Sequence, residues 1–227
     1  RQPSNYIHNV TIKGKAIGYK MQSEHIILAA EHFKKGENEI TIQFRAGDMS
    51  LNRNQEFLYT LFVPDRAATA IPCFDQPNLK GEYTLTLHTP LDWKALANGP
   101  LIKETENKDR RSFFFGETKP VSTYILAFAA GKFETITEDR NGYAMTMFHR
   151  ETDTLKVARN TDAIFDLHGD AIRWMENYTG IKYPFQKFDF ALIPGFQYGG
   201  MEHPGAIFYK DASLFLESSA TKSQYLG

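Results

Sequence analysis

The feature that most constrains this fold is a change of hydrophobic period along the chain. Up to about residue 135, apolar and polar side chains alternate, as in residues 39–44 and 83–88. A period of two places one face of a strand in a core and the other in water. Turn-forming segments at 35–38, 75–78 and 97–100 separate these strands. Short strands at this spacing predict an antiparallel sandwich or saddle.

One helical segment follows, from about residue 153 to residue 178. Its expected buried stripe consists of Leu155, Ala158, Phe165, Ile172 and Met175, flanked by Ile164, Leu167, Ala171 and Trp174. Asp153 or Thr154 can cap the first turn, and Gly180 can end the helix in the left-handed conformation. Further strands are predicted at 122–128, 143–148, 188–193 and 201–209. We therefore expect a mixed, mainly β chain with a β-rich unit at 1–133 and an α+β unit at 134–227.

Composition and charge exclude several classes of protein. The 227 residues are 42% hydrophobic and carry a formal net charge of −1, so the basic excess of a nucleic-acid binder is absent. No apolar run approaches the roughly 18–20 residues that span a bilayer. We expect a soluble protein without a membrane partner, in the cytoplasm or the periplasm. Because the chain does not begin with Met, we also expect it to be a segment of a longer protein.

The segment Gly199-Gly200-Met201-Glu202-His203 is unusual for a strand. Adjacent glycines remove side-chain bulk where another backbone could approach closely. An extended peptide could pair with such an edge, and Glu202 would then hold its cationic end. A charge-assisted hydrogen bond of this kind contributes roughly 1.5–3 kcal/mol. The alternative is a glycine bulge at a bend, with Glu202 in solvent.

The same segment resembles the Gly-x-Met-Glu-Asn motif of the M1 (gluzincin) metallo-aminopeptidases. Other stretches of the chain are similar to segments of that family and occur in the same order as in the family, at 72–81, 98–100, 122–128, 183–185, 189, 193–194 and 205–209. The resemblance spans roughly residues 40–227. It implies an N-terminal β domain, itself truncated at its start, followed by an incomplete thermolysin-like catalytic domain. It also implies a zinc-dependent aminopeptidase whose partners are peptide N-termini.

The resemblance assigns roles residue by residue. It makes Glu202 the catalytic-site residue that grips the α-amino group, while Gly199, Gly200, Met201 and His203 bind the substrate backbone with it. Two departures stand out. His203 replaces the usual Asn, and Val63 stands where many members place a second amine-binding Glu. Asp65 and Glu56 are candidate substitutes for that missing carboxylate.

The zinc motif of this family, His-Glu-x-x-His, does not occur in the chain. None of the seven histidines is followed by Glu. We therefore expect no metal ligands here and an inactive chain, with zinc bound in the full-length protein by residues beyond Gly227. A bifunctional leukotriene-A4-hydrolase-like member and a non-catalytic M1-like binding scaffold are the alternative functions.

The remaining reactive side chains are expected to be structural, namely Cys73, Asp75, His149 with Glu151, and His168. An incomplete second unit would leave its sheet uncovered. We therefore expect exposed apolar surface around residues 188–215 and self-association of the chain.

Overall fold

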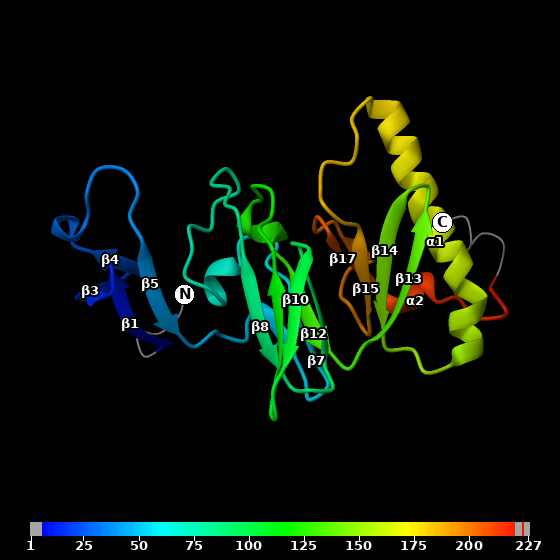
Figure 1. Ribbon diagram of the computed structural model, residues 1–227, viewed down its shortest axis with the longest axis horizontal. Coiled ribbons are helices and arrows are strands. Elements are labelled where there is room, and N and C mark those ends of the chain that lie inside the picture. Colours follow the sequence, from blue (N-terminus) through cyan, green and yellow to red (C-terminus); the bar gives the residue numbers. More distant parts are fainter. Residues whose placement is uncertain (1–5, 221–223, 225–227) are drawn as a thin grey trace.

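The computed structural model describes residues 6–220 and residue 224, and it places three sheet-containing parts in a row (Figure 1). The first part holds a sheet in the order β2-β1-β5 and a separate β3-β4 hairpin. Its elements are β1 (Ile7–Ile12), β2 (Lys15–Ala16), β3 (Tyr19–Gln22), β4 (His25–Leu28), a 3₁₀ turn (Ala30–His32) and β5 (Ile40–Phe44). These pairings are all antiparallel.

The central part contains two more antiparallel sheets, in the orders β10-β11-β8 and β6-β7-β12-β9. The strands are β6 (Leu51–Arg53), β7 (Phe57–Thr60), β8 (Leu85–Thr89), β9 (Lys94–Ala97), β10 (Leu101–Glu106), β11 (Arg111–Phe115) and β12 (Phe128–Gly131), with 3₁₀ turns at Ala67–Thr69 and Thr123–Ile125. The predicted mainly β fold with antiparallel sheets is confirmed.

The third part is a five-stranded mixed sheet in the order β13-β14-β15-β17-β16. Its elements are β13 (Glu134–Arg140), β14 (Tyr143–His149), α1 (Thr154–Thr179), β15 (Asp189–Ile193), β16 (Gly200–Met201), β17 (Ala206–Lys210) and α2 (Asp211–Leu214). The β14, β15 and β17 strands run parallel, while β13 and β16 are antiparallel edges. A helix joining parallel strands, followed by an antiparallel edge, is the predicted α+β arrangement.

The five-stranded sheet separates two hydrophobic cores, because its strands are apolar on both faces. On β15, Ala191 and Ile193 face the central part, whereas Phe190 and Leu192 face α1. The inter-unit core comprises Tyr59, Leu61, Leu96, Ala127, Ala129, Phe133, Phe148, Ala191, Ile193, Phe196, Met201, Ala206 and Phe208. The helix-facing core comprises Met145, Met147, Ile164, Phe165, Ile172, Phe190, Leu192 and Phe215. Figure 1 shows α1 on the outer side of this sheet.

Both predicted ends of α1 are confirmed. Asp153 Oδ1 accepts hydrogen bonds from the N–H groups of Leu155 and Lys156, each at 3.0 Å, and Gly180 has a φ of +69°. None of the helices in residues 6–220 and 224 combines the length and the apolar character needed to cross a bilayer.

The predicted buried stripe of α1 is partly wrong. Ile164, Phe165 and Ile172 are buried, but Leu155, Leu167, Trp174 and Met175 are exposed. The face that meets the sheet runs instead through Gly169, where a Cβ would lie 2.6 Å from the Arg140 Cβ. Close approach at this glycine turns the polar side chains of Asn160, His168 and Glu176 inward, where each forms hydrogen bonds.

Two predicted strands are also corrected. Residues 122–128 form a 3₁₀ turn followed by the start of β12, because the Ser122 and Thr123 hydroxyls bond the Pro77 carbonyl and Asp75 Oδ1. Residues 201–209 divide into β16 and β17 around a turn in which Gly205 has a φ of +71°.

The exposed apolar surface expected around residues 188–215 is absent. Among the large hydrophobic side chains of that stretch, only Tyr198 is exposed, at 43%. The central part and α1 cover the two faces of the sheet. Self-association of the chain and the division at residue 133 remain predictions.

Candidate functional site

The segment 199–203 forms a short free edge of the five-stranded sheet. β16 pairs with β17 through Gly200 opposite Tyr209 and Met201 opposite Phe208. The Lys210 N–H donates to the Gly199 carbonyl at 3.0 Å, which extends the pairing by one residue. In the described part of the chain, no strand lies along the other side of β16. Its backbone is therefore free to pair with an extended peptide.

The turn after β16 is bonded to the central part through Asn98. The Asn98 Nδ2 group donates to the carbonyls of Pro204 and Ile125, at 2.9 and 3.0 Å, and its Oδ1 accepts from the Ala127 N–H at 2.6 Å. A Cβ at Gly205 would lie only 2.5 Å from the Asn98 carbonyl oxygen. Glycine at 205 is required by both this contact and the positive φ.

A half-buried ion pair holds the same turn. Lys187 Nζ lies 2.8 Å from Asp189 Oδ2 and also donates to the Gly205 carbonyl. Asp189 Oδ1 accepts from the Thr146 N–H at 2.9 Å, which ties the pair to β14. Burial lowers the pKa of Lys187, and the Asp189 charge opposes that shift. Sequence reasoning gave no role to Asn98 or Lys187. Asn98 lies in the family-like segment 98–100, which was a signal, whereas Lys187 lies between the family-like positions 183–185 and 189 and carried none.

Glu202 differs from its neighbours by being exposed. Met201 and His203, on either side of it, are exposed by only 7% and 0%. Within residues 6–220 and 224, the Glu202 carboxylate has no hydrogen-bond or ion-pair partner. A free carboxylate beside a free strand edge is suited to bind the ammonium group of a peptide paired with β16.

His203 is buried against the inter-unit core instead of facing solvent. Its ring centroid lies 4.8 Å from that of Phe208. Neither ring nitrogen has a hydrogen-bond partner among the described residues. Burial lowers the pKa of His203 to about 3, so the ring is neutral at pH 7. The segment around it stays fixed by backbone bonds from the His203 N–H to the Met201 carbonyl and from the Ala206 N–H to the His203 carbonyl.

Position 63 contributes an apolar side chain beside the site. Val63 packs against the inter-unit core, which includes Met201. Of the two candidate substitutes for a second carboxylate, Glu56 forms an ion pair with Arg150. Asp65 lies exposed two residues after Val63. Glu202 is thus the one carboxylate of the predicted amine clamp that is free in the described chain.

The two adjacent glycines serve different purposes. A Cβ at Gly200 would lie 2.9 Å from Cδ1 of Tyr209, closer than real Cβ atoms approach. A Cβ at Gly199 would meet nothing within 4 Å among the described residues. Gly200 is therefore required by a side chain of the protein itself, while space for an approaching peptide lies beside Gly199.

The other reactive side chains have structural surroundings. Burial, followed by the Asp75 charge, raises the pKa of Cys73 to about 12, so the thiol is not poised as a nucleophile. Asp75 accepts from the Ala68 N–H and the Thr123 hydroxyl. His149 is buried with its ring edge against Phe215, and burial lowers its pKa.

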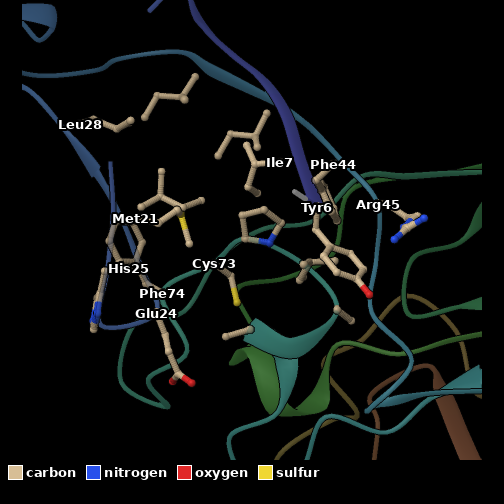
Figure 2. A pocket seen from close by; sticks show the side chains of 17 residues that line it. Tyr6, Ile7, Met21, Glu24, His25, Leu28, Phe44, Arg45, Cys73 and Phe74 are labelled. Carbon is tan, nitrogen blue, oxygen red and sulfur yellow. The ribbon is translucent and has the colours of Figure 1, made fainter. Parts of the chain in front are cut away.

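A separate cavity of about 360 Å³ lies between the first part of the molecule and the segment 68–74 of the central part, beside Cys73 (Figure 2). Its wall is mainly apolar, with Met21, Leu28 and Phe44 among the lining residues. None of residues 199–203 lines it. The cavity therefore has no part in the edge site.

The described residues do not fit a zinc site. In residues 6–220 and 224, no three His, Cys, Asp or Glu side chains are grouped so that they could hold a metal ion. His203 and Glu202 are adjacent, but one is buried and the other exposed. The chemistry available at the edge is thus recognition of a peptide and its terminal charge.

Over most of its length, the sequence is similar to those of known aminopeptidases. The family described as Peptidase M1 N-terminal domain matches residues 3–125, and the Peptidase family M1 domain matches residues 164–226. Glutamyl aminopeptidase of Sus scrofa is 33% identical over 70% of this chain and 17% of its own length. Probable aminopeptidase 1 of Sulfurisphaera tokodaii is 28% identical over 97% of this chain and 28% of its own. Aminopeptidase N of Streptomyces lividans is 26% identical over 96% of this chain and 26% of its own length. The chain spans less than a third of each of these relatives.

Proposed function

Because the chain belongs to the peptidase M1 family, we propose that the protein carrying it is an aminopeptidase that removes residues from the N-termini of peptides. The relatives named above are aminopeptidases, which supports this class of reaction. The observation that carries the proposal is the exposed carboxylate of Glu202 beside the edge strand β16, neither of which has a further partner among the described residues.

In this proposal, the substrate backbone pairs with the segment 199–203 as an added strand. Glu202 accepts hydrogen bonds from the substrate α-ammonium group, so that the first peptide bond is aligned for cleavage. Gly199 leaves room for the incoming backbone, and Met201 and His203 anchor the strand from the inter-unit core. Val63 leaves the amine site with a single carboxylate.

Zinc dependence of the longer protein is part of the same proposal. A zinc ion supplies Lewis acidity and an activated water in peptide hydrolysis. Its ligands would come from segments other than the described residues, which contain no fitting group. We therefore expect this chain alone, supplied with zinc, to show no peptidase activity, and turnover by the purified chain would contradict this.

The test of the proposed function is Glu202→Gln in the full-length protein. The change keeps the side-chain size but removes the charge that holds the ammonium group. We expect kcat/KM for free-amine dipeptide amides to fall by about 10- to 100-fold, as loss of one charge-assisted hydrogen bond predicts. The matched control is Glu134→Gln on β13, at the opposite edge of the sheet.

The control is expected to retain the parental kcat/KM. If the parent shows no preference for free over N-acetylated substrates, the aminopeptidase assignment is wrong. If the full-length protein binds peptides without cleaving them, it is a binding scaffold.

A further inference from the structure

Tyr209 and His168 lie behind the candidate edge, and sequence reasoning assigned neither of them a functional role. Tyr209 belongs to β17 and is the register partner of Gly200 on β16. Its ring fills the space where a Gly200 side chain would project, since a Cβ there would meet Cδ1 at 2.9 Å and Cε1 at 3.1 Å. The Tyr209 ring is therefore in direct packing contact with the strand that carries the site.

The Tyr209 hydroxyl is held by His168 of α1. His168 Nε2 lies 3.1 Å from Tyr209 Oη, and His168 Nδ1 lies 2.7 Å from the Ile164 carbonyl oxygen. A carbonyl only accepts, so Nδ1 carries the hydrogen atom. In the neutral ring Nε2 then accepts, and the Tyr209 hydroxyl donates. Burial lowers the pKa of His168 and raises that of Tyr209 to about 12, which keeps both groups neutral.

The His168 ring is itself fixed from two sides. It stacks on Phe190 with ring centroids 4.3 Å apart and planes 7° from parallel. Phe190 belongs to β15, at the centre of the sheet, and is fully buried. The contacts thus run without a break from the rigid helix and sheet centre, through His168 and Tyr209, to Gly200 at the edge.

We propose that the His168–Tyr209 pair is a positioning device that sets the place of β16, and hence of the Glu202 carboxylate, relative to a bound peptide. The edge strand is two residues long and, among the described residues, pairs only with β17. Its own hydrogen bonds therefore hold its position in the sheet weakly. The Tyr209 ring supplies the missing support from behind, and the hydroxyl bond to His168 stops the ring from moving away. This inference rests on the proposed amine recognition by Glu202.

The role differs from that of an ordinary core contact in a measurable way. A residue that only stabilises the fold lowers the unfolding midpoint and leaves ligand discrimination unchanged in the folded molecules. A positioning residue lowers the preference for a ligand whose amine must meet Glu202 over the same ligand without that amine. The readout is therefore the ratio of inhibition constants for a dipeptide amide and its desamino analogue.

The experiment compares Tyr209→Phe with the parent in the full-length protein. Phenylalanine keeps the ring against Gly200 but removes the bond to His168. We expect the free-amine preference to fall by about 2- to 10-fold, the range that one neutral hydrogen bond predicts. Tyr19→Phe is the matched control, because the Tyr19 hydroxyl also donates one bond of 3.1 Å, to the Ile7 carbonyl in the first part of the molecule. That control should keep the parental ratio.

A double-mutant cycle completes the test. In a His168→Phe background, which retains a ring to stack on Phe190, Tyr209→Phe should produce no further loss of the ratio. Should Tyr209→Phe keep the full parental ratio while lowering stability as Tyr19→Phe does, the pair is only structural and the inference is wrong. A parent without any free-amine preference would instead contradict the proposed function, so the two failures are distinguishable.

Discussion

The two edges of the five-stranded sheet are built in opposite ways. β13 is seven residues long, pairs along its whole length with β14, and carries four charged side chains. Arg140 on this edge bonds Glu138, Asp162 and Asp166. Charged side chains on an exposed edge discourage pairing with another strand. β16 is two residues long and begins with a glycine, and the Glu202 carboxylate just after it has no partner in the part of the chain that the structure describes.

The two edges therefore suit different roles: the β13 edge resists pairing with another strand, and the β16 edge can bind one. The ion pairs of Arg140 protect the β13 edge, because another strand could pair with β13 only by breaking them. The β16 edge is left open, and its position is fixed from outside the strand by Asn98, Lys187 and Tyr209. An edge that is open yet firmly supported is suited to bind an extended peptide in one register. Three changes test this contrast.

The largest expected effect comes from removing the anchor of the open edge, with Asn98→Ala. The change deletes three hydrogen bonds at a buried side chain and leaves their backbone partners unpaired. We expect a loss of about 2–4 kcal/mol in the free energy of unfolding, measured by urea denaturation. Asn52→Ala, at an exposed position on β6, is the matched control and should change stability little. Equal losses in the two variants would show that Asn98 does not anchor the turn.

A smaller, pH-dependent effect is expected from His203, which is buried beneath the open edge. Its pKa is about 3 in the folded protein and 6.5 in the unfolded chain, so between these values the unfolded chain binds the extra proton. Stability therefore falls as pH falls below 6.5, by about 1.4 kcal/mol per pH unit and roughly 2 kcal/mol at pH 5.

His203→Asn should remove this part of the pH dependence in denaturant titrations between pH 7 and pH 5. His8→Asn, at an exposed position on β1, is the matched substitution and should keep the parental slope. An unchanged slope in His203→Asn would mean that the His203 ring reaches solvent or a partner in solution.

The smallest expected effect is on the guarded edge, with Arg140→Met. The change keeps much of the aliphatic packing on α1 but removes the ion pairs with Glu138, Asp162 and Asp166. Exposed ion pairs contribute little and are screened by salt, so the unfolding midpoint should fall by a few degrees at most, and less in high salt. The sharper readout is light scattering, where the variant should associate more readily than Arg53→Met. Equal light scattering from the two variants would show that the charges on β13 do not prevent association at this edge.

Several features of the molecule were determined by the sequence itself. Period-two alternation specified the antiparallel strands, and Asp153 and Gly180 specified the ends of α1, because these signals act within a few residues. The family-like segments also located Glu202, and the run of side chains around it predicted an edge open to a peptide.

Only the tertiary structure decided which surfaces meet. The apolar residues of α1 allow more than one buried face, and close approach at Gly169 selected the face that contains His168. Glycine is likewise needed at position 200 because of the ring of Tyr209, which is nine residues away along the chain but opposite Gly200 in the sheet. Asn98 and Pro204 are far apart in sequence, so no local pattern could reveal their hydrogen bond. Local propensities decide which elements form, but a site made by contacts between distant segments is fixed only when those elements pack.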